Sequence, residues 1–164
     1  MTNALLHNGL FGNLLRDAKI SDAFSTTAFL DKMMAFELAW TAGLAAVGAV
    51  SQDDADGAIA HLSRFEFDLD DLARGSGRDG IPVPAMIAQL KAGQAPNIKA
   101  AIHTGTTSQD VIDTAMVLTL RDVSTLIATR LQTVIVRLDR LDETFGKAAL
   151  MGRTRMQAAR PITV

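Results

Sequence analysis

Residues 108–145 of this 164-residue chain read SQDVIDTAMVLTLRDVSTLIATRLQTVIVRLDRLDETF, the longest stretch with one helical pattern. The 40 residues 106–145 contain neither Gly nor Pro, the two residues least favourable within a helix. Apolar residues recur along the stretch at steps of three and four, the pattern of one helix face. These residues are Ile112, Met116, Leu120, Val123, Ile127, Leu131, Val134, Leu138, Leu141 and Phe145. A helix from Ser108 to Phe145 would be roughly 55 Å long at 1.5 Å per residue.

A helix of that length cannot bury its apolar stripe against the shorter helices expected before it. Its stability then depends on other long helices, which implies a bundle with partner helices from other chains. The composition agrees, because 48% of the residues are hydrophobic, only 5% are aromatic and Pro numbers 4. We therefore predict an all-α fold, in which an N-terminal helical domain is followed by one long helix of an incomplete bundle.

Shorter helices precede the long one. Residues that cap helices and apolar steps of three and four predict their positions, and Gly marks their ends. We expect helices over 28–50, from a cap at Ser51 through Leu62, over 68–74 and over 82–92, with a flexible loop at 75–80 and a break at 93–97. The predicted domains are 1–104, the N-terminal helical domain, and 105–164, the start of the bundle domain.

The C-terminal segment is basic and has no recognisable helix cap. After Glu143 the chain contains no acidic residue. The basic residues beyond that point are Lys147, Arg153, Arg155 and Arg160. The last four residues, PITV, neither cap a helix nor form a tail. We expect an N-terminal fragment of a longer protein, with a natural short basic terminus as the alternative.

Composition argues against several classes of protein. The absence of Cys excludes disulfides, thiolate nucleophiles and Cys-ligated zinc. His7, His61 and His103 lie far apart, which disfavours a metal site built on histidines. A net charge of −2 argues against nucleic acid as a partner. The uncharged stretches are too short or too polar for a membrane span or a secretory signal, so we expect a cytoplasmic protein.

The segment HTGTTSQD, residues 103–110, is the first candidate site. Backbone N–H groups at the start of a helix attract anions, and Thr106, Thr107 and Ser108 add hydroxyl donors. Together they would form a cradle for a carboxylate. Alternatively, Ser108 only caps the helix and the threonines solvate a turn. His103 could act as an acid or base near neutral pH, or it could be a structural hydrogen-bonding group.

The segment RTRMQ, residues 153–157, is the second candidate site. Arg153 and Arg155 provide two fixed positive charges and Gln157 provides an amide. Guanidinium groups pair with carboxylates through two parallel hydrogen bonds, which suits a substrate with several negative charges. A solvated basic loop is the alternative. Nucleic acid fits poorly because no aromatic residue lies between the charges.

Together, two segments resemble the signatures of the fumarase/aspartase superfamily. HTGTTSQDV at 103–111, followed by Asp113-Thr114, resembles the first signature. GRTRMQA at 152–158, followed by Pro161, resembles the second. The branch that lactonises 3-carboxy-cis,cis-muconate in protocatechuate breakdown is the most similar, through Phe36-Glu37 and residues 80–84, GIPVP. Two signatures in order, separated by one long helix, make the resemblance specific.

The sequence departs from the superfamily pattern at two places. Many members carry His where this chain has Arg155, and an Arg cannot release a proton near pH 7. This departure, with the absence of Tyr, favours the cycloisomerase branch over adenylosuccinate lyase. The third signature, a mobile loop with the catalytic Ser, is absent and would lie beyond residue 164, so we expect the 164-residue chain alone to be inactive.

The resemblance implies a cycloisomerase that closes a lactone on a small tricarboxylate without a metal or organic cofactor. It implies catalytic roles for His103 and Arg155. It further implies substrate binding by Thr106, Thr107, Ser108, Gln109, Arg153, Thr154 and Gln157. The enzyme would be a homotetramer with sites assembled from several subunits. A lyase of the adenylosuccinate or argininosuccinate type and a non-catalytic helical association domain remain alternatives.

Overall fold

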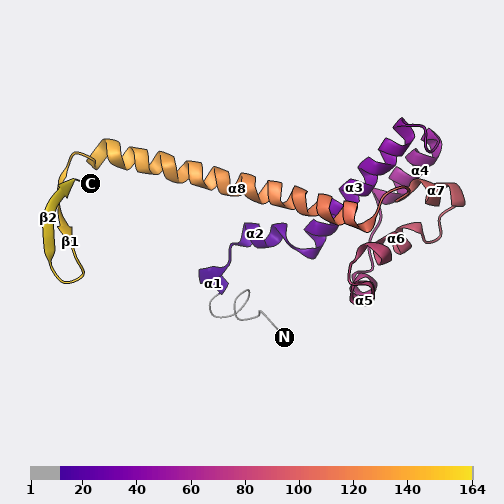
Figure 1. Cartoon of the computed structure of the whole chain (residues 1–164), viewed down its shortest axis with the longest axis horizontal. Helices are drawn as coiled ribbons and strands as arrows, with labels where there is room; N and C mark the ends of the chain where they lie inside the picture. The colour runs from indigo at the N-terminus through magenta and orange to yellow at the C-terminus, as the bar shows by residue number, and fades with distance from the viewer. Residues whose placement is uncertain (1–11, 164) are drawn as a thin grey trace. The chain divides into compact units, whose positions relative to one another are not determined.

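The structure, a computed structural model, describes residues 12–163 (Figure 1). Helices dominate these residues, which confirms the predicted all-α fold, and the last residues add one small antiparallel sheet. The elements are α1 Gly12–Leu15, α2 Ala18–Ala23, α3 Thr26–Ala46, α4 Gln52–Leu62, α5 Leu69–Asp79, α6 Val83–Lys91, α7 Pro96–Ala101, α8 Ser108–Phe145, β1 Ala149–Arg153 and β2 Ala158–Thr163.

Contacts divide the chain into two compact units, one ending at Arg121 and one beginning at Asp122. The first unit contains the short helices and the start of α8, and the second contains the rest of α8 and the hairpin. The domain boundary that the sequence suggests between residues 104 and 105 stays a prediction.

Capping side chains fix where four of the helices begin, α2 through Asp17 and three more as follows. Ser25, directly before α3, accepts a hydrogen bond from the Ala28 backbone N–H. Ser51 does the same for Asp54 at the start of α4, at 3.1 Å, so the predicted cap is confirmed. The Asp68 side chain caps α5 in the same manner. Each cap satisfies a backbone donor that the helix leaves without an internal partner.

The prediction that a helix stops at Gly75 and a flexible loop follows is wrong. Helix α5 continues through residues 75–79 and ends at Gly80, whose φ of 77° gives the left-handed C-cap. Gly75 is buried where α5 packs on α6, and a Cβ there would lie 2.3 Å from the Ala85 Cβ. Glycine at 75 therefore allows two helices to approach closely and does not end one.

Helix α7 and the C-terminal hairpin are among the elements that were not predicted. Helix α7 begins at Pro96, inside the predicted break at 93–97. Proline suits this position because the first turn of a helix needs no backbone N–H from it. The basic C-terminal segment, in which no helix or strand is predicted, forms the hairpin of β1 and β2.

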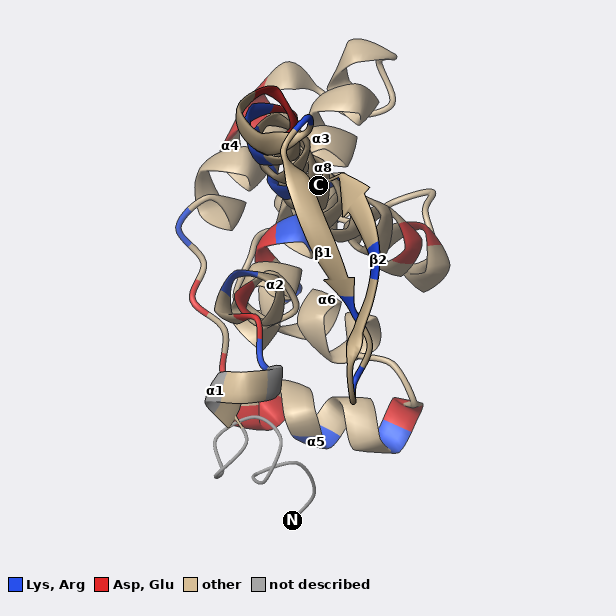
Figure 2. Cartoon of the chain, turned by 90° about the vertical axis from the view of Figure 1, so that its left-hand side faces the viewer, with Lys and Arg blue, Asp and Glu red and all other residues tan. Residues whose placement is uncertain are grey.

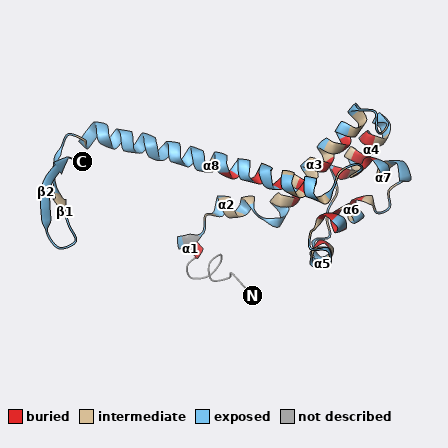
Figure 3. Ribbon diagram, in the orientation of Figure 1, coloured by how far each residue is buried: buried red, intermediate tan, exposed pale blue. Residues whose placement is uncertain are grey.

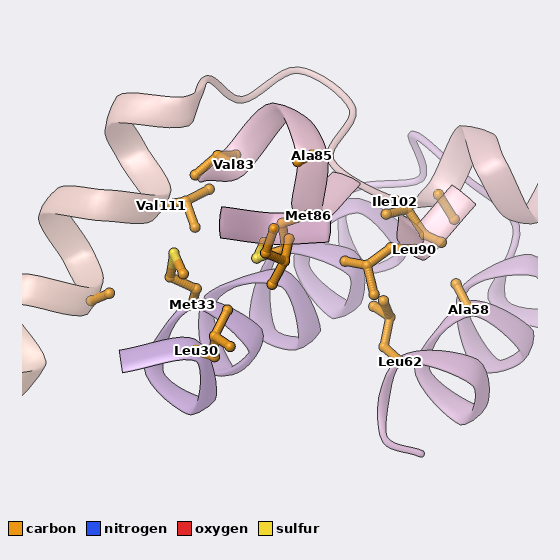
Figure 4. Close-up of a cluster of buried hydrophobic side chains, with 13 residues drawn as sticks. Leu30, Met33, Ala58, Leu62, Val83, Ala85, Met86, Leu90, Ile102 and Val111 are labelled. Carbon is orange, nitrogen blue, oxygen red and sulfur yellow. The ribbon is translucent and has the colours of Figure 1, made fainter. Parts of the chain in front are cut away.

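The hydrophobic core lies in the first unit and joins α3, α4, α5, α6 and the start of α8 (Figure 4). Met33 on α3, Met86 on α6 and Val111 on α8 are almost completely buried there. Ile102, in the segment between α7 and α8, is also fully buried. The segment that precedes α8 is thus held by the core as well as by the polar contacts described below.

Helix α8 has the bounds that its apolar pattern predicts, Ser108–Phe145. Its first part is buried, through Val111, Ala115, Thr119 and Val123. Every residue from 127 to 145 is exposed in the single chain (Figure 3). The exposed apolar side chains include Ile127, Leu131, Val134, Leu138, Leu141 and Phe145. Self-association through these residues stays a prediction.

Strands β1 and β2 pair antiparallel, with Ala149 opposite Thr163 and Arg153 opposite Ala158. The register shifts between Met151 and Arg153, so Gly152 lies at an irregularity of the ladder. The hairpin shows basic residues and no acidic ones (Figure 2). No helix within residues 12–163 combines the length and apolar character needed to cross a bilayer.

Candidate functional site

The segment between α7 and α8 is attached to α3 by side chains of that helix. The Thr41 hydroxyl donates a buried hydrogen bond of 3.0 Å to the Ala101 carbonyl. The Trp40 indole donates one of 2.8 Å to the Thr104 carbonyl. These carbonyls lie at the end of α7 and in the turn beyond it, where the backbone needs partners from elsewhere. Helix α3 therefore determines how the chain runs into the first candidate site.

His103 lies between these two anchors, and its partner is Glu37 on α3. The His103 Nδ1 is 2.7 Å from the Glu37 Oε1, with the Glu37 side chain fully buried and the His103 side chain 14% exposed. The second carboxylate oxygen of Glu37 is buried without a hydrogen-bond partner. His103 has a φ of 56°, in the left-handed region that few residues other than Gly adopt.

Asp110 organises the turn before α8. Its Oδ2 accepts hydrogen bonds from the Thr107 backbone N–H at 2.8 Å, the Thr107 hydroxyl at 2.9 Å and the Thr106 hydroxyl at 3.0 Å. The Thr107 backbone N–H makes the largest contribution to holding the pKa of Asp110 below its ordinary value, and the two hydroxyls add to it. A carboxylate oxygen is thus already bound by the donors that the sequence assigns to substrate.

The remaining predicted residues of this segment begin α8. Ser108 is the first residue of the helix and is half-buried. Gln109 is exposed and its side-chain amide donates to the Asp113 carboxylate one turn later. His103 and all four of the predicted binding residues 106–109 thus lie in the short segment that leads into α8 and in its first residues.

The second predicted set lies in the turn between β1 and β2. The Thr154 hydroxyl accepts hydrogen bonds from the backbone N–H of Gln157 at 3.1 Å and of Met156 at 3.4 Å. The Thr154 backbone N–H donates to the Gln157 carbonyl at 2.8 Å. Thr154 thereby closes the turn, with Arg153 before it and Arg155 within it, both exposed.

The two sets belong to different compact units, and α8 lies between them in the chain. Within residues 12–163 no group of three or more His, Asp or Glu side chains is arranged to hold a metal ion. Sequence reasoning gave no site role to Glu37 or Asp110. Glu37 carried a signal, because it is the one charged residue between Lys32 and Asp53 and lies at helical spacing from Met33.

Comparisons with known proteins agree on one family. The family described as lyase matches residues 16–164. The chain is 34% identical to nitrosuccinate lyase of Streptomyces davaonensis, over 98% of this chain and 34% of that protein. It is 28% identical to 3-carboxy-cis,cis-muconate cycloisomerase of Acinetobacter baylyi, over 94% of this chain and 36% of that protein.

Solved structures show the same similarity. The crystal structure of fumarate lyase from Mesorhizobium sp. BNC1 superimposes with a TM-score of 0.81 at 31% identity, covering 90% of this chain and 34% of that one. This chain therefore spans about a third of the length of the relatives it matches.

Proposed function

This chain belongs to the lyase family that matches residues 16–164, and on that premise we propose that the protein containing it is a cycloisomerase of 3-carboxy-cis,cis-muconate. Its substrate is a small tricarboxylate, its product is a lactone, and the reaction needs no metal or organic cofactor. Similarity to the cycloisomerase of Acinetobacter baylyi over 94% of this chain supports the assignment.

The observation that carries the proposal is the positive turn of the hairpin. Arg153 and Arg155 flank Thr154, whose hydroxyl holds the turn closed, and no acidic residue follows Glu143. A guanidinium stays charged at neutral pH and pairs with a carboxylate through two hydrogen bonds. Arg155 stands where many superfamily members have His, so this position binds and polarises a carboxylate and does not transfer a proton. Gln157 adds an amide donor.

The start of α8 binds a second carboxylate. Thr106, Thr107, Ser108 and Gln109 lie in one turn, at the end of the helix where backbone N–H groups favour anions. The hydrogen bonds to Asp110 show that the donors of residues 106–107 converge on a single carboxylate oxygen. Substrate binding redirects the threonine hydroxyls from Asp110 to the substrate.

In the reaction, a carboxylate oxygen of the substrate forms a C–O bond to one end of a conjugated double bond. The electron pair of that double bond moves toward the neighbouring carboxylate, which becomes enolate-like. A proton then bonds to the adjacent carbon, and the lactone is complete. In this proposal Arg155 stabilises the developing charge and His103 delivers the proton.

We propose, as the resemblance to the superfamily implies, that the protein is a homotetramer in which each site is assembled from several subunits. The α8 start and the hairpin turn each supply residues to such a site.

The test is an assay of the gene product that contains this chain, following loss of the conjugated diene absorbance of 3-carboxy-cis,cis-muconate. Arg155→Ala is expected to lower kcat about 10²–10³-fold, the usual cost of removing one preorganised group that stabilises charge. Arg160→Ala is the matched control, because Arg160 is exposed on β2 outside the turn. Equal effects of the two variants, or no turnover by the unmodified protein, would refute the proposal.

Elimination from nitrosuccinate is the second candidate. The 34% identity to the nitrosuccinate lyase of Streptomyces davaonensis favours it. The same cationic turn and helix start would hold the two carboxylates of that substrate. Elimination releases nitrite and leaves a carbon–carbon double bond, so nitrite measured in parallel with the diene absorbance separates the two reactions.

A further inference from the structure

We propose that Glu37 is the positioning residue for His103: it holds the proton on Nδ1 and so makes Nε2 the ring nitrogen that meets the substrate. The assignment of substrate chemistry to Nε2 rests on the proposed function. The geometry of the pair stands independently of it.

The contact between the two side chains is a short hydrogen bond. The distance from the His103 Nδ1 to the Glu37 Oε1 is 2.7 Å, at the short end for an N–H···O bond. The ring's other nitrogen, Nε2, has no hydrogen-bond partner among the residues that the structure describes. With Nδ1 occupied, Nε2 is the nitrogen left for a ligand.

The burial of Glu37 is costly, so packing alone does not explain it. The side chain is fully buried and its Oε2 has no partner, although burial of an unpaired polar atom opposes folding. An apolar residue would fill the same position on the buried face of α3, next to Met33 and Thr41, without this cost. Among the residues that the structure describes, the one hydrogen-bond partner of this side chain is the imidazole of His103.

The backbone around His103 is held at the same time. Glu37, Trp40 and Thr41 are three and four residues apart and therefore lie on one face of α3. Trp40 and Thr41 bind the carbonyls of Thr104 and Ala101, on either side of His103. His103 itself has a left-handed φ of 56°, a conformation that persists only where the surroundings enforce it. One face of α3 thus fixes both the ring and the main chain.

A neutral imidazole carries one proton, and the carboxylate of Glu37 can only accept a hydrogen bond. The proton of a neutral His103 therefore lies on Nδ1, and Nε2 presents its lone pair. When His103 is doubly protonated, Nε2–H is the donor. In either state proton exchange with the substrate occurs at Nε2, in the manner of a histidine oriented by a buried carboxylate.

The first test is the tautomer of His103, measured by NMR on the gene product with 15N-labelled histidine. The signals of His103 are assigned by their loss in His103→Gln. The neutral ring is expected to carry its proton on Nδ1, and Glu37→Gln is expected to shift the population toward Nε2–H. Thr41→Val, which removes an anchor on the same face of α3, is the matched control and should leave the tautomer unchanged.

The second test is a double-mutant cycle on turnover. Glu37→Gln is expected to lower kcat by about 10²-fold or more, the lower end of what a positioned acid or base contributes. In a His103→Gln background the same change should alter kcat less than about twofold, because the group it positions is gone. Independent, multiplying losses would show that Glu37 is merely structural and would overturn the proposal.

The two tests separate this proposal from the proposed function. An Nε2–H tautomer in the unmodified protein overturns the role of Glu37, whatever substrate is turned over. An Nδ1–H tautomer that depends on Glu37 supports the pair even if carboxymuconate and nitrosuccinate are both inert. The tautomer of the unmodified protein is read with only the His103→Gln spectrum for assignment, so it decides the matter even if Glu37→Gln does not fold.

Discussion

Gly75→Ala tests whether the contact between α5 and α6 depends on a missing side chain. The added Cβ would lie 2.3 Å from the Ala85 Cβ, whereas carbon atoms in contact are about 3.5–4.0 Å apart. The helices must separate by more than about 1 Å to relieve the overlap. We place the steric cost near 3 kcal/mol, the upper end for overpacked cores. Alanine regains about 1 kcal/mol of helix propensity, so the net loss is about 2 kcal/mol.

Combining Gly75→Ala with Ala85→Gly removes the overlap, because the methyl group then lies on α5 and no longer on α6. Ala85→Gly alone removes a buried methyl group and lowers helix propensity, which costs about 2 kcal/mol. In the double variant the methyl added at 75 faces the Cα of residue 85 at 3.7 Å, an ordinary contact. We therefore expect the double variant to be close to the unmodified protein in stability, with each single variant well below it.

Unfolding followed by circular dichroism at one protein concentration measures these differences. A net loss of about 2 kcal/mol corresponds to a Tm lower by roughly 4–8 °C. Gly77→Ala is the matched control, because position 77 lies in the same helix with nothing within 4 Å of an added Cβ, and it should raise Tm slightly. Additive losses in the double variant would refute this account of Gly75.

Two other predictions concern helix starts. The pKa of Asp110 is lowered in the folded chain, chiefly by the Thr107 backbone N–H, so its carboxylate stabilises the fold above about pH 4 and this stabilisation is lost as the pH falls toward the lowered value. The difference in Tm between the unmodified protein and Asp110→Asn should therefore shrink in acid, and a constant difference from pH 7 to pH 3 would contradict it. Ser51→Ala should cost about 1 kcal/mol through loss of the α4 cap, measured by urea unfolding. Ser63→Ala, at the opposite end of α4, should change stability by less than about 0.5 kcal/mol, and equal effects would argue against the cap.

Helix boundaries that depend on neighbouring residues were predictable from the sequence. The bounds of α8 follow from its uninterrupted apolar steps, and the start of α4 follows from the cap at Ser51. The match of residues 16–164 to the lyase family confirms the family-level resemblance. This resemblance was predictable because it rests on contiguous motifs. These features depend on residues close together in the chain.

The features that could not be predicted depend on distant partners. Gly75 looks like a helix stop until Ala85 is known to pack against it. The strands of the hairpin lack the alternation of apolar and polar residues that marks a half-buried strand, because nearly every residue in them is exposed. Local sequence rules assign loops in such cases.

The candidate site also contains residues that the local sequence predicts and residues that only the structure reveals. The segment from His103 to Gln109 was found from its own residue types, and the structure confirms that it leads into α8. Glu37, whose side chain contacts the His103 ring, lies 66 residues earlier, so the residue types around His103 do not reveal it. That Asp110 accepts hydrogen bonds from Thr106 and Thr107 is likewise visible only in the geometry of the turn.

Because residues 101–104 are attached to α3, the HTGTTSQD segment is not expected to keep its conformation when it is moved into another protein. Besides its local bonds to Asp110, the segment is held by three hydrogen bonds that reach back 60, 64 and 66 residues. A peptide or a chimera that carries the motif alone would lack these three bonds. Contacts of such long range carry a large loop-closure entropy cost, which the rest of the fold must offset. An engineer who transplants this turn must transplant the face of α3 that carries Glu37, Trp40 and Thr41 together with it.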